Sequence, residues 1–360
     1  MTRTNNLISF AGGGSAGHVT PNLPLIEQLQ KEGWDVLYYG TPKGIEREII
    51  AGAAIPYQPI PSGKLRRYFS WQNFLDPFVI LWGVLRACLH IAGKRPRVLF
   101  SKGGFAAVPP VIGAWLARVP IVIHESDRTP GLANRICSRF AAKVCVSYAD
   151  SPLLADPRTV LTGAPVRESL FHGDRDKALA LTGFDGTRPI LLCFGGSLGA
   201  KAINAALRDA LDDLTKTYDV VHVTGAGNLA PSLEGLSNYW QAEFVQEEFA
   251  DLLAAADVAV SRAGANAIAE LVALHIPNLL IPLPLSQSRG DQIENAALAR
   301  VDGLSAVLPE EELTAQGLIT ALVDLDGKKD GYRQAMAGRS CDRGGAAVLE
   351  VIRGVAGPQA

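Results

Sequence analysis

Residues 7–17 read LISFAGGGSAG, and residues 190–199 read ILLCFGGSLG. In both stretches an apolar run leads into a glycine turn and then into helical sequence, which is typical of a buried strand that turns directly into a helix. Backbone N–H groups at such a helix start are available to an anion. The repeat therefore predicts two similar α/β domains that face one cleft.

Length and composition agree with two globular domains. The chain has 360 residues, 48% of them hydrophobic and 19% charged, which is more than one ordinary core requires. The 5 cysteines include no CxxC pair, so we expect neither a disulfide framework nor a zinc site, and a reducing cytoplasm fits best. We see no apolar stretch of the ~18 residues that a membrane span needs and expect a protein that is neither secreted nor integral.

Strand and helix candidates alternate along the whole chain, which predicts parallel sheets with crossover helices. The strand candidates are residues 7–11, 34–39, 97–101, 120–124 and 143–147, then 190–194, 219–224, 257–261 and 278–281. In the second half, helices are expected near 199–214, 247–255, 264–273 and 289–301. Glycine and proline in residues 163–166 indicate the hinge, so the expected division is 1–163 and 164–342.

Residues 61–100 contain many lysines and arginines, and Asp76 is the one acid among them. Asp76 and Pro77 predict a helix N-cap and first turn, and Gly93 predicts its end. Apolar residues recur between them at helical spacing: Phe78, Leu81, Trp82, Leu85 and Leu89. Such a helix fits either an anionic membrane surface or a protein core with solvated basic ends, and periodicity does not separate the two.

The first turn formally matches the dinucleotide fingerprint, as Gly12-x-Gly14-x-x-Gly17. A nicotinamide site also needs an acid after the second strand, but that strand ends Leu37-Tyr38-Tyr39-Gly40. No Gly-Lys-Ser/Thr of a P-loop follows either turn. These observations still allow a nucleotide that carries a diphosphate.

The second half contains further groups suited to such a ligand. Residues 261–266, Ser-Arg-Ala-Gly-Ala-Asn, follow an apolar strand and open another helix. Glu270, farther along that helix, can accept from both hydroxyls of a ribose or can be a solvated helix acid. Arg167 can contact a diphosphate or lie on the surface.

Six motifs, in order, resemble those of the MurG family, the peptidoglycan glycosyltransferases that add N-acetylglucosamine to lipid I. The motifs are Gly13-Gly14-Ser15-Ala16-Gly17-His18, His124-Glu125-Ser126-Asp127, Ala164-Pro165-Val166-Arg167, Gly195-Gly196-Ser197-Leu198-Gly199-Ala200, Arg262-Ala263-Gly264, and Gly290-Asp291-Gln292 with Asn295. The resemblance implies a GT-B fold of two Rossmann-like domains. The N-terminal one would hold the acceptor, the C-terminal one UDP-N-acetylglucosamine, and a last helix, about 343–357, would return to the first domain.

The resemblance also implies a donor site. Its residues would be Ser15, Gly17, Asp127, Arg167, Ser197, Phe244, Val245, Arg262, Gly264, Ala265, Asn266, Glu270, Asp291 and Gln292. The backbone at Phe244 and Val245 would read uracil while their side chains pack. Asp291 departs from the glutamine that many members carry, and a carboxylate accepts from sugar hydroxyls but cannot donate to them.

The implied reaction is a single displacement with inversion at the anomeric carbon, which needs one base. His18 is the leading candidate, because an imidazole titrates near neutral pH. Its alternative roles are a bond to backbone or orientation of the acceptor diphosphate. Asp127 is the rival, as base, sugar contact or cap of the next helix, and Glu125 is a further carboxylate with a structural alternative.

No protein-bound metal or other cofactor is expected. Asp-x-Asp occurs at 174–176 and 324–326, but the flanking residues predict surface loops and helix ends. The expected partners are UDP-N-acetylglucosamine, polyprenyl-linked lipid I and an anionic membrane at the cytoplasmic face, without nucleic acid. Phe78, Leu81, Trp82 and Leu85 would contact that membrane. The competing hypotheses are a related transferase for another membrane lipid, such as diacylglycerol, and a nicotinamide enzyme.

Overall fold

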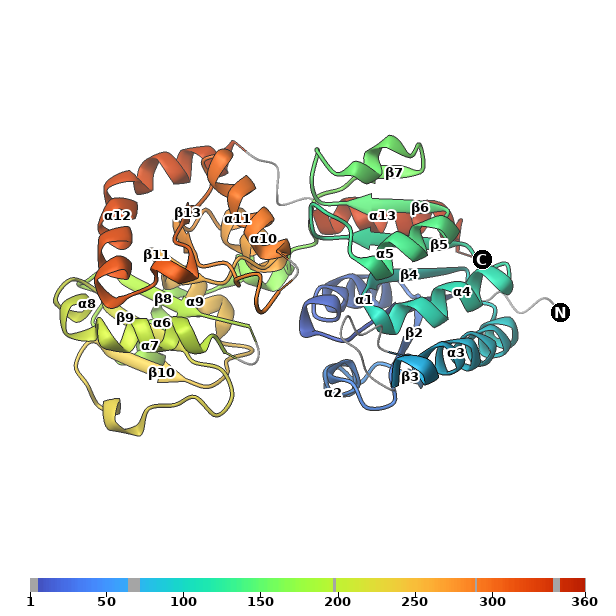
Figure 1. The fold of residues 1–360 in the computed structure, drawn as a ribbon, viewed down its shortest axis with the longest axis horizontal. Helices are drawn as coiled ribbons and strands as arrows, with labels where there is room; N and C mark the ends of the chain where they lie inside the picture. Colours follow the sequence, from blue (N-terminus) through green and yellow to red (C-terminus); the bar gives the residue numbers. More distant parts are fainter. Residues whose placement is uncertain (1–5, 64–71, 197–198, 289, 339–343, 360) are drawn as a thin grey trace. The chain divides into compact units, whose positions relative to one another are not determined.

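The computed structural model describes residues 6–63, 72–196, 199–288, 290–338 and 344–359. The chain divides into two compact units, Met1–Pro165 with Arg343–Ala360, and Val166–Asp342. Each unit contains one parallel sheet with helices on both of its faces (Figure 1). This confirms the expected pair of parallel α/β folds.

The first unit has a 7-stranded sheet in the order β3-β2-β1-β4-β5-β6-β7. Its strands are β1 (Leu7–Gly12), β2 (Asp35–Gly40), β3 (Tyr57–Pro59), β4 (Val98–Gly103), β5 (Ile121–Glu125), β6 (Lys143–Val146) and β7 (Thr159–Leu161). Its α-helices are α1 (Asn22–Lys31), α2 (Ile45–Gly52), α3 (Gln72–Lys94), α4 (Val108–Leu116), α5 (Leu132–Cys137) and α13 (Gly344–Ala356). The order places the first and fourth strands side by side at the centre, as in a Rossmann sheet.

The second unit repeats this order in a 6-stranded sheet, β10-β9-β8-β11-β12-β13. Its strands are β8 (Ile190–Phe194), β9 (Asp219–Val223), β10 (Tyr239–Ala242), β11 (Val258–Ser261), β12 (Asn278–Leu280) and β13 (Ala306–Val307). Its α-helices are α6 (Arg175–Thr182), α7 (Lys201–Asp209), α8 (Leu211–Thr217), α9 (Phe249–Ala255), α10 (Ala265–Ala273), α11 (Asp291–Val301) and α12 (Ala315–Ala337). The strand alternation expected from the sequence is therefore present in both halves.

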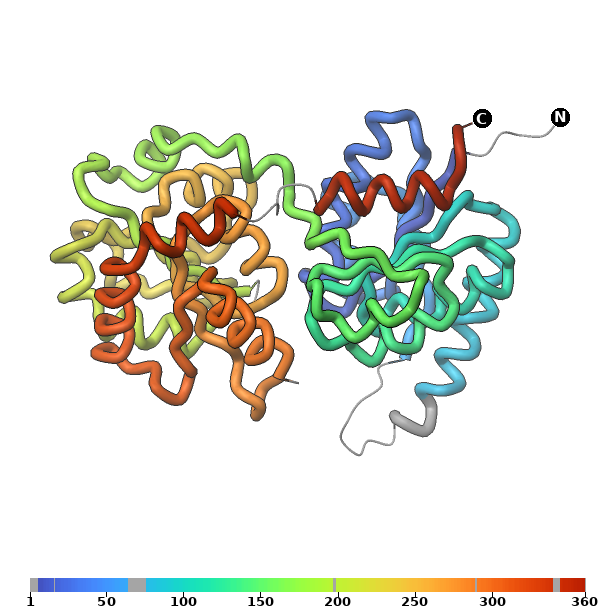
Figure 2. The backbone as a smooth tube through the Cα atoms, turned by 90° about the horizontal axis from the view of Figure 1, so that it is seen from above, coloured from blue at the N-terminus to red at the C-terminus, as the bar shows by residue number. Residues whose placement is uncertain are grey.

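The central strands are buried on both faces, which explains their continuous apolar runs. Phe100 packs with side chains of α1, α2 and α13, whereas its neighbour Leu99 packs with those of α3, α4 and α5. The last helix, α13, lies beside the N-terminal segments of its unit, and Val348 and Ile352 are buried there (Figure 2). Arg353 on α13 forms an ion pair with Glu32 at the end of α1.

Four strands were not foreseen. They are β3, β7, β10 and β13, and each lies at an edge of its sheet. Their lengths are 3, 3, 4 and 2 residues, too short for an alternating or apolar pattern to stand out from a loop. The helical stretch expected at 199–214 is two helices, α7 and α8, joined at Ala210.

The start of α3 corrects one expectation. The helix begins at Gln72, so Asp76 and Pro77 are not its N-cap and first residue, and Pro77 lies inside the helix. Proline has no backbone N–H to donate to the carbonyl four residues earlier, but the other backbone hydrogen bonds of α3 keep this segment helical. The spacing of the apolar residues predicted the helix correctly, whereas the Asp-Pro pair predicted a first residue that is too late in the sequence.

A second correction concerns hydrophobic length. Asp76–Lys94 has 19 residues and a mean hydropathy of 1.3, which is long and apolar enough to cross a membrane, so the expectation that no stretch reaches this length is wrong. Length and composition alone do not make α3 a membrane span, because one side of this helix is part of the core of its unit. Ala87 and Ile91 are fully buried, and a Cβ at Gly83 would lie 2.0 Å from the carbonyl oxygen of Pro61.

Candidate active site

Each glycine turn follows one of the inner strands of its sheet, β1 in the first unit and β8 in the second. In a parallel sheet of this order, ligands bind outside the carboxyl ends of the strands, where neighbouring crossovers leave on opposite faces. In the first unit this edge lies after β1, β4 and β5. In the second it lies after β8, β10, β11 and β12. Many of the site residues singled out from the sequence follow these strands directly.

The second turn requires glycine at its end. Gly199 has φ +77°, and a Cβ there would lie 2.3 Å from the carbonyl oxygen of Thr224. The chain thus passes close to the end of β9 before α7 begins at Lys201. Ser197, an expected diphosphate contact, lies outside the described residues.

The start of α10 presents an open helix terminus. Gly264 is the N-cap, with extended backbone (φ −71°, ψ 139°), and no described side chain caps it. Apart from Gly264 itself and its two chain neighbours, no described residue has an atom within 4 Å of the position that a Cβ of Gly264 would take. The positive end of the α10 helix dipole therefore lies at a backbone position, Gly264, beside open space suited to an anion.

Arg167 and Glu270 form an ion pair at this helix. Arg167 Nε donates to Glu270 Oε1 at 3.1 Å, and the guanidinium carbon lies 5.6 Å from the centre of the Phe249 ring. Their side chains are 29% and 17% exposed. Burial raises the pKa of Glu270, and the Arg167 charge opposes that rise. The sequence indicated both residues separately, but nothing in it indicated that they meet.

Two other expected donor residues are engaged within the protein. Arg262 Nη1 donates to the carbonyl oxygen of Ile281 at 3.2 Å and lies 2.5 Å from a carboxylate oxygen of Glu310. Gln292 Oε1 accepts from the backbone N–H of Leu283 at 3.1 Å. Both side chains therefore brace the loop between β12 and α11.

That loop ends at Gly290, which has φ +90° and precedes Asp291, the first residue of α11. At the end of β10, Val245 packs against the core of the second unit. Phe244 is 56% exposed, so the expectation that its side chain packs is wrong. An exposed ring at the strand-end edge is available to a planar ligand.

A buried carboxylate occupies the first glycine turn. Gly14 has φ +94°, and its N–H donates to Glu46 Oε2 at 3.2 Å. The backbone N–H and the hydroxyl of Thr41 donate to Glu46 Oε1 at 3.0 and 2.5 Å. Glu46 is fully buried. The N–H of Gly14, which the sequence offered to an external anion, is therefore already bonded to Glu46, and no sequence motif pointed to Glu46.

His18 ends a short 3-10 helix, Ala16–His18, directly after that turn. Its side chain is half-buried, and its Cδ2 atom lies 3.0 Å from the position that a Cβ of Gly104 would take. Its backbone carbonyl accepts from Asn22 Nδ2 at 3.2 Å. The structure thus brings His18 next to the turn that follows β4.

Glu125 holds the loop after β5. It accepts from the N–H groups of Asp127 and Gly131 at 2.9 and 3.1 Å and from Asn134 Nδ2 at 3.0 Å. Burial and the charge of Asp127 raise its pKa. Gly131 is the N-cap of α5, so the alternative in which Asp127 caps that helix is wrong. Lys102, fully buried beside this loop, was not foreseen.

The two Asp-x-Asp stretches have structural roles. Asp174 is the N-cap of α6, as a helix end predicts. The other stretch lies inside α12 rather than at a helix end: Asp324 pairs with Lys328, and Asp326 accepts from the hydroxyl of Tyr218. Among the described residues there is no group of three or more His, Cys, Asp and Glu side chains that could hold a metal ion.

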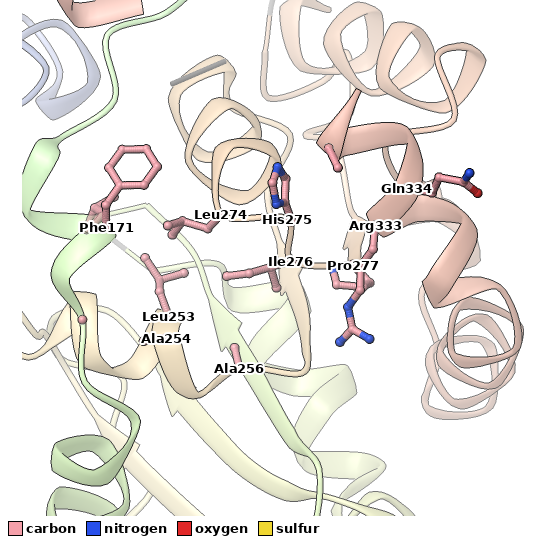
Figure 3. A pocket seen from close by; sticks show the side chains of 13 residues that line it. Phe171, Leu253, Ala254, Ala256, Leu274, His275, Ile276, Pro277, Arg333 and Gln334 are labelled. Atoms are coloured by element: carbon pink, nitrogen blue, oxygen red, sulfur yellow. The ribbon is translucent and has the colours of Figure 1, made fainter. Parts of the chain in front are cut away.

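A pocket of about 610 Å³ lies elsewhere in the second unit (Figure 3). Ala256 and Pro277 line it, and each lies just before the start of a strand, β11 and β12. The pocket is therefore at the amino ends of the strands, opposite to the edge where sheets of this type bind nucleotides. Its lining is mostly aliphatic, with Arg333 at one side.

Comparisons with known proteins agree with this geometry. The glycosyltransferase family 28 N-terminal domain matches residues 8–146, and the glycosyltransferase family 28 C-terminal domain matches residues 190–346. The chain is 49% identical over 330 residues, 91% of its length and 94% of the relative's, to UDP-N-acetylglucosamine--N-acetylmuramyl-(pentapeptide) pyrophosphoryl-undecaprenol N-acetylglucosamine transferase 2 of Bacillus anthracis. It is 50% identical over 331 residues, 91% and 93% of the two chains, to the transferase of the same name, without the number, from Geobacillus thermodenitrificans.

Solved structures share the fold. The crystal structure of Acinetobacter baumannii MurG superposes with a TM-score of 0.74 at 24% identity and covers 96% of this chain and 98% of that one. The calicheamicin glycosyltransferase CalG4 superposes with a TM-score of 0.69 at 16% identity and covers 98% of both chains.

Two doubly wound units with glycine turns at their switch points and an open helix start in the second define a GT-B glycosyltransferase. The chain belongs to glycosyltransferase family 28 and, within it, to the MurG family. It is therefore a hexosyltransferase, and the resemblance found in the sequence motifs is confirmed.

The Arg167–Glu270 pair generates a prediction about stability. Arg167→Met removes the charge that offsets burial of the Glu270 carboxylate, so the pKa of Glu270 rises further above its unfolded value. The variant then keeps most of its stability at low pH, where Glu270 is protonated. It loses stability as the pH rises through the pKa that Glu270 has in the folded state. We expect a loss of about 2 kcal/mol at pH 8, or roughly 5 °C in Tm, and a smaller loss at pH 4.5.

Calorimetry of the parent and variant at both pH values measures this difference. The double variant Arg167→Met/Glu270→Gln should lose the extra pH dependence, because no carboxylate remains to titrate. Equal losses at pH 4.5 and pH 8 in the single variant would contradict the role assigned to the pair.

Proposed function

We propose that the protein transfers N-acetylglucosamine from UDP-N-acetylglucosamine to the 4-hydroxyl of the N-acetylmuramoyl sugar of polyprenyl-linked lipid I, which makes lipid II for peptidoglycan. Relatives named for transfer to this acceptor, about half identical over nine tenths of the chain, support the proposal. The observation that carries it is the open start of α10 with the Arg167–Glu270 pair beside it. The second unit then binds the donor, and the first binds the acceptor.

The donor site uses charges and dipoles already held in place. The start of α10 stabilises the diphosphate, and Arg167, which uses one of its five N–H groups on Glu270, adds a fixed positive charge. Glu270 accepts from the ribose hydroxyls with its remaining lone pairs, and the backbone at Phe244 and Val245 reads uracil. The proposed donor contacts also include Ser15, Gly17, Asp127, Ser197, Arg262, Gly264, Ala265, Asn266, Asp291 and Gln292.

The transfer is an in-line displacement with inversion. The acceptor oxygen bonds to the anomeric carbon while the bond from that carbon to the β-phosphate oxygen breaks, and the electron pair leaves with UDP. A base takes the hydroxyl proton, and His18 and Asp127 are the two candidates. Helix N–H groups and Arg167 stabilise the charge that develops on the departing diphosphate.

Transfer itself can be assayed directly. The purified chain with labelled UDP-N-acetylglucosamine and a lipid I analogue should yield labelled disaccharide lipid. His18→Ala and Asp127→Asn identify the base, because loss of the base lowers kcat by about 10²–10⁴-fold with little change in the KM for donor. Absence of transfer to lipid I together with transfer to diacylglycerol would replace the proposal with the other lipid acceptor.

Transfer should not depend on a divalent ion. Helix dipole and arginine supply the positive charge at the diphosphate, and the carboxylates of Asp174, Asp324 and Asp326 are engaged in bonds within the second unit. Adding EDTA to the same assay should leave kcat within about twofold. Loss of turnover with EDTA that returns when Mg²⁺ or Mn²⁺ is added in excess would contradict this.

The α3 helix supports a peripheral position at the cytoplasmic membrane face. α3 exposes six large apolar residues, and the end of α4 exposes two more: Phe78, Val79, Leu81, Trp82, Leu85 and Leu89, with Trp115 and Leu116. The α3 residues other than Val79 were singled out from the sequence, whereas the packing of α4 on α3 was not foreseen (Figure 1). Exposed Arg86, Lys94 and Arg95 suit anionic headgroups.

Membrane binding should therefore depend on the outer side of α3. Phe78→Glu with Leu81→Glu should weaken binding to phosphatidylglycerol-containing vesicles at least tenfold in a sedimentation assay, because two charges replace side chains that would leave water. UDP-N-acetylglucosamine affinity should stay unchanged. The matched control is Val301→Glu with Val323→Glu, two exposed residues of the second unit. Equal vesicle binding by the two double variants would refute the membrane role of α3.

A further inference from the structure

Lys102 is the penultimate residue of β4, and its side chain is only 1% exposed. Its Nζ atom lies 2.7 Å from His124 Nδ1 and donates to Ser126 Oγ at 2.5 Å. Lysine is almost never fully buried without a partner, because removing an ammonium from water is costly. Its burial at the carboxyl end of β4, next to the loop that carries Asp127, therefore requires an explanation.

The direction of these hydrogen bonds follows from the partner of His124. His124 Nε2 lies 2.9 Å from the carbonyl oxygen of Gly163, which can only accept, so Nε2 carries the proton. Burial holds the pKa of His124 well below its usual range, and the ring is neutral. Its Nδ1 lone pair therefore accepts from Lys102, and the charge of Lys102 has to be offset elsewhere.

The offsetting charges are carboxylates. The titratable groups that face Lys102 are His124, Glu125 and Asp127 on β5 and its loop, and the Cys145 thiol on β6. Burial lowers the pKa of Lys102 to about 7, and the charges of Glu125 and Asp127 oppose this. Glu125 and Asp127 repel each other, which contributes to the raised pKa of Glu125. One ammonium thus acts electrostatically on two carboxylates that otherwise disfavour each other's charge.

We propose that Lys102 is a positioning residue for sugar transfer: its ammonium holds the Ser126–Asp127 segment at the sheet edge and supplies the positive charge that lets Asp127 and Glu125 stay ionised together. This inference rests on the proposed function, because Asp127 matters for transfer only as a base or sugar contact. Lys102 acts through Asp127 and does not itself touch substrate.

The test is the pH dependence of kcat in the variant Lys102→Met. Methionine keeps the approximate length of the side chain and removes its charge. Without the ammonium the neighbouring carboxylates take up a proton at higher pH, so the acid limb of kcat should move up by about 1 pH unit. On the acid side of the limb we expect a roughly tenfold lower kcat than that of the parent at the same pH, while the KM for UDP-N-acetylglucosamine changes less than twofold. Lys102→Gln, which keeps an N–H donor without the charge, should move the limb in the same direction and serves if the methionine variant does not fold.

Two controls separate charge from packing. Lys143→Met makes the same change at the first residue of β6, where the amino ends of the strands lie. This variant should leave the pH profile of kcat unchanged. Ser126→Ala removes one hydrogen bond but keeps the charge, so it should lower kcat less and leave the acid limb in place.

An acid limb that stays in place in both neutral Lys102 variants would overturn the proposal, whatever happens to kcat or Tm. A limb that moves equally in Ser126→Ala would also overturn it, because the charge is still present there. Failure of the proposed function has a different signature, which is absence of transfer by the parent chain.

Discussion

The structure depends on parallel strands that are buried on both faces. Such a strand cannot end in a solvated hairpin; it has to turn into a helix that covers one face of its own sheet. Glycine allows that turn next to β1 and β8, with φ +94° at Gly14 and +77° at Gly199. Because all strands of a sheet point the same way, every loop at this edge brings its residues to the same place. Site residues from distant parts of each half of the chain therefore meet there.

Charged side chains hold this edge in shape. Glu46 binds the backbone of the first turn, Lys102 and Glu125 fasten the loop after β5, and Arg262 braces the loop before α11. Loops at the end of a sheet leave backbone N–H and C=O groups that hydrophobic packing cannot satisfy. Charged groups satisfy them with stronger hydrogen bonds, provided that each charge is itself paired or well bonded. The same groups that stabilise the loops thereby set the electrostatics of the site.

The two glycine turns have similar sequences but different surroundings. The first is closed by the carboxylate of Glu46, an anion that the protein itself supplies to Gly14. The second lies in a unit where the helix start at Gly264 is open and is flanked by Arg167. The same motif therefore lies in two different environments. In the first unit a carboxylate of the protein binds the turn, and in the second unit the sheet edge is suited to an external anion. This difference depends on α2 and α10, which the motifs themselves do not include.

The sequence by itself determined the central strands, the helices between them and the family, because apolar runs and glycine motifs are formed by residues that are close together in the sequence. It did not determine the edge strands, which have at most 4 residues, or the first residue of α3. Only the tertiary structure decided that Gly14 meets Glu46, Lys102 meets His124, and Arg167 meets Glu270, partners that are 32, 22 and 103 positions apart. Those pairs follow from strand order and crossover direction, and burial then selects the partner for each charge. No periodicity along the chain records that choice.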